Sequence, residues 1–71
     1  MLWLKRWNFI ERARLERELW DAFEAKDDIE AMVNGLKARI EAMDPTDPEL
    51  GDQNFRLEVW MTTMERIRKI E

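Results

Sequence analysis

The sequence predicts an all-α protein: an antiparallel helical hairpin with coiled-coil-like packing. The first observation is a stripe of residues spaced alternately three and four apart, which is typical of a helix packed lengthwise against another. The second is that proline first occurs at Pro45, and the third is a shorter run with the same spacing near the C-terminal end. The stripe consists of Leu15, Leu19, Ala22, Lys26, Ile29, Val33, Leu36, Ile40 and Met43.

The first helix is expected from about residue 2 to residue 43. No glycine or proline precedes Lys26, and the three–four spacing passes through this residue without a skip. Both the absence of helix breakers and the unbroken spacing are expected of one continuous helix. The alternative is a three-helix bundle with a break near residues 26–28, where Asp27 and Glu30 have the spacing of a capping box.

A loop is expected at residues 44–52. Asp44 precedes Pro45, and the residue before a proline is pushed out of the helical region, while proline itself lacks the N–H group that a helix needs. Thr46 and Glu49 again have capping-box spacing, so an earlier start of the next helix stays open.

The last helix is expected at about residues 53–70. It ends in basic residues, which the helix dipole favours. Its stripe contains Leu57, Trp60, Met64 and Ile67. At 1.5 Å per residue this helix reaches back only about 30 Å, to about residue 25 of the first helix. The apolar residues before that point therefore have no partner within a hairpin.

The 71 residues are expected to form a single helical domain, 1–71, in which residues 1–10 are a candidate docking arm.

The residue types argue against an enzyme. The chain contains no cysteine, histidine, tyrosine or serine. The commonest general base, the thiolate nucleophile and the usual transition-metal ligands are therefore missing. We expect no catalytic residue, no metal and no cofactor.

The charge is distributed unevenly. Residues 1–14 carry four basic and one acidic side chain, a net +3, whereas residues 44–54 carry four acidic side chains and no basic one. The whole chain has a net charge of −4 and a pI near 4.9. This balance argues against a nucleic-acid partner, because nucleic-acid-binding domains are usually basic.

The apolar surface exceeds what a two-helix hairpin can bury. Trp3, Trp7 and Ile10 cluster on a helical wheel, roughly opposite the stripe. Large exposed apolar patches are rare on monomers, and aromatic residues and methionine are enriched at protein interfaces. We therefore expect a protein-interaction surface. Its candidate residues are Trp3, Trp7, Ile10, Leu15, Leu19, Trp20, Phe23 and Trp60.

These features favour a small helical protein–protein interaction or structural subunit. It would form a homo-oligomer or dock on a larger assembly, such as a phage particle or virion. One alternative is a small acidic inhibitor that blocks an enzyme or a nucleic-acid site. Another is a peripheral membrane protein anchored by the Trp-, Lys- and Arg-rich N-terminal segment. No signal peptide or membrane-spanning run is expected, so the cytoplasm or a macromolecular assembly is the expected location.

Overall fold

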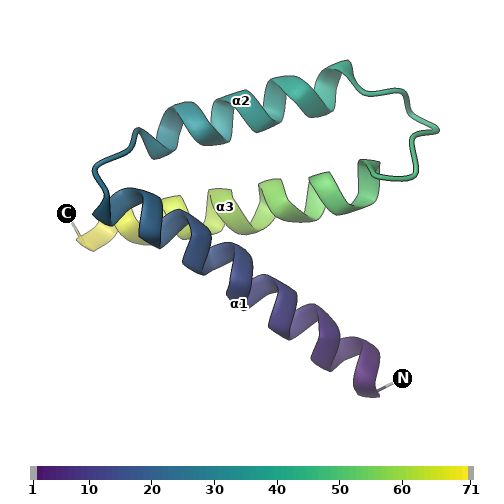
Figure 1. Ribbon diagram of the computed structural model, residues 1–71, viewed down its shortest axis with the longest axis horizontal. Helices are drawn as coiled ribbons and strands as arrows, with labels where there is room; N and C mark the ends of the chain where they lie inside the picture. The colour runs from purple at the N-terminus through teal and green to yellow at the C-terminus, as the bar shows by residue number, and fades with distance from the viewer. Residues whose placement is uncertain (1, 71) are drawn as a thin grey trace.

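Three helices make up the fold in a computed structural model, which describes the backbone of residues 2–70 and the side chains of residues 9–70. They are α1 (Leu2–Glu24), α2 (Ile29–Ala42) and α3 (Leu50–Ile70), and the described residues contain no strand. The all-helical prediction is confirmed. Helices α2 and α3 run antiparallel side by side, while α1 crosses α3 and diverges from it towards the N-terminus (Figure 1). The Cα atoms extend 36 × 33 × 18 Å, so the molecule is two helices thick.

The segment predicted as one long first helix is two helices, because the chain turns at residues 25–28. The N–H group of Lys26 donates to the carbonyl of Phe23 at 3.0 Å. The N–H group of Asp27 donates to the carbonyl of Ala22 at 2.9 Å. This pair of bonds is a Schellman motif, which requires a left-handed residue after the helix. Lys26 takes that role with a φ of 66°.

Helix α2 begins with a side-chain cap and ends before a proline turn. Asp28 Oδ1 accepts a hydrogen bond from the N–H group of Ala31 at 3.0 Å, one residue later than the predicted capping box. At the other end, Asp44 Oδ1 accepts from the N–H group and the hydroxyl of Thr46, at 2.8 and 2.7 Å. These two bonds lower the pKa of the Asp44 carboxyl, because they stabilise its charged form.

Helix α3 begins at Leu50, three residues before the predicted start, and ends at Ile70 as predicted. The loop before it is closed by Asp47, whose Oδ1 atom accepts from the N–H group of Glu49 at 2.8 Å. The backbone carbonyl of Asp47 also accepts from the N–H group of Leu50, at 3.1 Å. Helical hydrogen bonding therefore starts before residue 53, as in the earlier start that the sequence left open.

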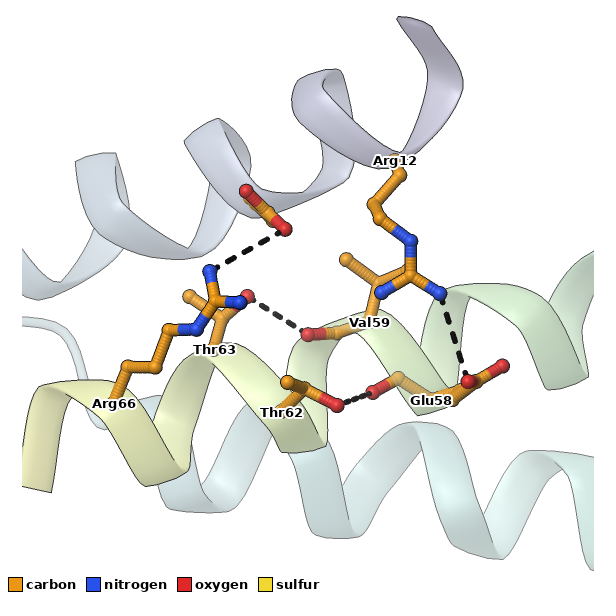
Figure 2. A network of polar contacts seen from close by, with 7 residues as sticks. Arg12, Glu58, Val59, Thr62, Thr63 and Arg66 are labelled. Carbon is orange, nitrogen blue, oxygen red and sulfur yellow. Dashed lines mark hydrogen bonds and ion pairs between the residues drawn. The ribbon is translucent and has the colours of Figure 1, made fainter. Parts of the chain in front are cut away.

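Helix α3 carries the core, because α1 and α2 both pack mainly on it and contact each other little. The buried apolar side chains are Leu15, Leu19, Val33, Leu36, Val59, Trp60 and Ile67. The hydroxyl of Thr63 is also buried, and it donates to the carbonyl of Val59 at 2.8 Å (Figure 2). The polar side chain therefore enters the core without leaving its donor unpaired.

The burial of Leu15 and Leu19 corrects one expectation. A hairpin with a long first helix left both residues without an intramolecular partner. In the structure the chain turns back after α1, so these two side chains lie against α3 and are 2% and 0% exposed. Ion pairs accompany this contact: Arg12 lies 3.6 Å from Glu58 (Figure 2), and Arg56 lies 3.0 Å from Glu18.

Candidate interaction surface

The N-terminal half of α1 exposes two adjacent large apolar side chains. Phe9 is 72% exposed and Ile10 is 55% exposed. Both belong to the N-terminal half of α1, and the N-terminal end of this helix diverges from α3 (Figure 1). Arg12 contacts α3, because its guanidinium lies over the ring of Phe55 at 5.5 Å. The exposed pair precedes this contact along α1.

The predicted interaction residues whose side chains are described fall into three groups. Leu15, Leu19 and Trp60 belong to the core. Trp20 and Phe23 are half-buried against it, with their rings edge to face at 6.1 Å. Of the predicted residues whose side chains are described, Ile10 alone is exposed. The side chains of Trp3 and Trp7 lie outside the described residues.

Phe9 is an exposed residue that the predicted surface did not include. The sequence contained a signal for it, because Phe9 forms a column on the helical wheel with Ala13, Trp20 and Phe23, beside the main stripe. In the structure this column changes from exposed at Phe9 and Ala13 to half-buried at Trp20 and Phe23. The change follows the divergence of α1 from α3.

Charged side chains continue this surface along the outer face of α1. Arg14, Arg17, Asp21 and Glu24 are all exposed. Arg14 donates to Glu11 on the same helix at 2.6 Å. Within the described part of the chain, the other three have no ion-pair partner. By contrast, Glu16 and Glu18 on the inner flank of α1 pair with arginines of α3, at 3.8 and 3.0 Å.

Two of the grooves between the helices are similar in size. A groove of about 530 Å³ lies between α1 and α3, and its charged lining residues are Glu11, Arg14, Asp52 and Arg56. A second cavity, of about 520 Å³, lies between α2 and α3 next to Trp60. Both linings mix charged with apolar side chains, and the acidic and basic groups of the first balance. Neither groove gathers the convergent donors or acceptors that a specific small-molecule site needs.

The described residues contain no group of side chains arranged to hold a metal ion. No helix in residues 2–70 combines the length and the apolar character needed to cross a membrane. No protein-family model, no curated protein and no solved structure matches the chain. The candidate site is the outer face of α1, because it exposes Ile10 beside Phe9 together with several charged side chains.

Proposed function

We propose that the chain is a small helical interaction or structural subunit whose outer α1 face binds protein. The observation that carries this proposal is the exposure of Phe9 and Ile10 side by side on a helix that leaves the body of the molecule. Single exposed apolar residues are normal, but contiguous ones mark interaction surfaces. Burying such side chains contributes about 25 cal/mol per Å² of apolar area removed from water.

The charges next to this pair support the same role. Arg17, Asp21 and Glu24 are exposed on the same face. They continue the apolar pair along the helix, and polar side chains that border an apolar area are usual at protein interfaces. The proposed role is binding without catalysis, in a homo-oligomer or in a larger assembly such as a phage particle or virion.

For the architecture, we propose that the three helices stay folded as a bundle rather than opening into a hairpin with one long helix. Support comes from the buried Leu15 and Leu19 and from the ion pair between Glu18 and Arg56. A continuous helix over residues 2–43 would be about 60 Å long. The Cα atoms instead extend 36 Å along the longest axis. Small-angle scattering at low concentration distinguishes these two maximum dimensions.

Site-specific photo-crosslinking in the native host tests the binding role. A benzophenone amino acid replaces Ile10 in one variant and Ile70 in a matched control. Ile70 is 72% exposed but lies at the end of α3. We expect crosslinks to protein from position 10 and few from position 70. Equal yields at the two positions, or no product from position 10, would contradict the proposal.

A substitution strengthens this experiment. Phe9→Ser in the chain that carries the position-10 crosslinker should lower the crosslinking yield, because it removes the aromatic half of the surface. Met61→Ser is the control, since Met61 is an exposed apolar residue on α3. Circular dichroism should show the same helix content in both variants. A yield that Phe9→Ser leaves unchanged would remove Phe9 from the binding surface.

A further inference from the structure

We infer that the protein bound at the outer face of α1 is a second copy of this chain, packed antiparallel along α1. This inference rests on the proposed function and names its partner. The surface involved, called here the outer stripe, consists of Ile10, Arg14, Arg17, Asp21 and Glu24.

The outer stripe is one continuous line on the helix. Its members are spaced alternately four and three apart, which is the spacing of a coiled-coil seam. All five are exposed, and they lie on regular helix, since α1 extends from Leu2 to Glu24. The opposite side of α1 holds the buried Leu15 and Leu19. A helix can therefore lie along the outer stripe without disturbing the core.

The order of charges on the outer stripe is self-complementary. From the N-terminal end it presents an apolar residue, two arginines and then two acidic residues. An antiparallel copy centred on residue 19 places Arg17 opposite Asp21 of the second copy. The same register places Arg14 opposite Glu24 of the second copy, and two-fold symmetry repeats both pairs. Opposite charges at such positions set the orientation of helix pairs.

A parallel arrangement of the two copies would not pair opposite charges. It would place Arg17 opposite Arg17 and Asp21 opposite Asp21 of the second copy, so that like charges meet along the whole outer stripe. Like charges facing each other across an interface disfavour the arrangement. The pattern therefore selects the antiparallel orientation and, within it, the register centred on residue 19.

These charges are available for a partner. Among the described residues, Arg17, Asp21 and Glu24 form no ion pair. Arg14 pairs only with Glu11 of its own helix, and its side chain remains 65% exposed. The charges on the inner flank are already used: Arg12, Glu16 and Glu18 all pair with α3. The ion pairs between α1 and the other helices thus do not include the described charges of the outer stripe.

The same register determines which part of the second copy lies next to the exposed apolar residues. Phe9 and Ile10 of one copy lie beyond Glu24 of the other, beside its exposed turn at residues 25–28. Ala13 and Trp20 flank the outer stripe and add apolar area, since Ala13 is exposed and Trp20 is half-buried. The charges therefore set the register, and the turn offers Phe9 and Ile10 the apolar atoms of Ala25 and of the aliphatic stem of Lys26, since its other two residues are Asp27 and Asp28.

A charge swap tests the inference. Arg14 and Glu24 are ten residues apart, which is about 15 Å along a helix, so they cannot pair within one chain. We expect the wild-type chain to sediment as a dimer. Arg14→Glu and Glu24→Arg should each weaken dimerisation about tenfold or more, because each replaces two opposite pairs by two like pairs. The double variant should recover the wild-type dissociation constant.

Controls separate association from folding. Thermal unfolding at low concentration checks that each variant still folds. Lys37→Glu reverses an exposed charge on α2, outside the outer stripe, and should leave the dissociation constant unchanged. A wild-type chain that stays monomeric at all accessible concentrations overturns the inference. A dimer that the double variant fails to recover also overturns it.

The crosslinking experiment separates the two proposals. Crosslinks from position 10 to another copy of the chain support both. Crosslinks to a different protein, together with a monomer in sedimentation, overturn the second-copy inference and leave the proposed function standing. The absence of any crosslink from position 10 overturns the proposed function.

Discussion

The guanidinium of Arg56 lies over the indole ring of Trp60, with its Cζ atom 5.4 Å from the ring centroid. The same guanidinium donates to Glu18 of α1 at 3.0 Å. Arg56 therefore links the surface of α1 to a ring that is buried in the core. Stacking of this kind contributes about 0.5–1 kcal/mol at partly exposed sites.

Trp60 contains an unpaired buried donor, which leads to a first prediction. The side chain is 8% exposed, and its Nε1–H group has no acceptor in the described part of the chain. An unpaired buried donor costs about 1–3 kcal/mol. Trp60→Phe removes the donor and keeps an aromatic ring, so we expect its free energy of unfolding to lie within about 1 kcal/mol of wild type. Trp60→Ala should cost about 3–5 kcal/mol. Urea denaturation followed by circular dichroism measures both, and equal losses would contradict the prediction.

The core and the outer surface of α1 should respond differently to truncation. Leu19 is fully buried, so Leu19→Ala should cost about 2–5 kcal/mol. Ile10 is mainly exposed, and Ile10→Ala should change the free energy of unfolding by no more than about 0.5 kcal/mol. Both are measured at low concentration, where association does not contribute. A large loss with Ile10→Ala would place this residue in a core rather than on a binding surface.

Lys26 gives a prediction whose sign distinguishes a turn from a continuous helix. Its backbone lies in the left-handed region, which costs a residue with a side chain about 1–2 kcal/mol and costs glycine almost nothing. Lys26→Gly should therefore raise the free energy of unfolding by about 1 kcal/mol. In a continuous helix the same substitution would lower it by about 1 kcal/mol. Lys26→Ala is the control, because alanine keeps the penalty of the left-handed conformation.

Asp44 makes the stability of the loop depend on pH. The hydrogen bonds from Thr46 hold the pKa of the Asp44 carboxyl below its ordinary value of 3.8. The folded state therefore favours the carboxylate, and the resulting stabilisation is fully present above that value. It is lost as the pH falls through the lowered pKa. We expect Asp44→Ala to be less stable than wild type at neutral pH, with a difference that shrinks below pH 3.8.

A titration of Asp44 by NMR checks the cause. Thr46→Ala removes the hydroxyl donor but keeps the backbone donor, so the pKa of Asp44 should rise part of the way towards its ordinary value. A pKa that does not change would show that the hydroxyl contributes nothing. A difference in stability that persists at low pH would show that the role of Asp44 does not depend on its charge.

Much of the fold could be predicted from residue spacing and breakers. Val33, Leu36 and Ile67 lie on the predicted stripes and are buried, and the helix that precedes Pro45 ends there as expected. The turn after α1 was visible only as an alternative. The usual sign of such a turn is glycine, and here Lys26 takes the left-handed conformation instead. The unbroken three–four spacing therefore favoured the wrong boundary.

The candidate site could be predicted in part. Leu15 and Leu19 were assigned to an interface because a hairpin could not reach them, and the turn at residues 25–28 removes that reason. Phe9 was missed, although it stands in the same column of the wheel as Trp20 and Phe23, which were included. Whether a position in that column is exposed depends on where α1 leaves α3, and a helical wheel carries no information about crossing angles.

The position of α3 in the chain affects how the protein can be synthesised. Both other helices bury their apolar side chains against Val59, Trp60 and Ile67, near the C-terminal end. On the ribosome, α1 and α2 emerge before these residues, so their apolar faces have no partner within the chain until α3 has been synthesised. Until α3 emerges, the nascent α1 and α2 should therefore be a substrate for chaperones.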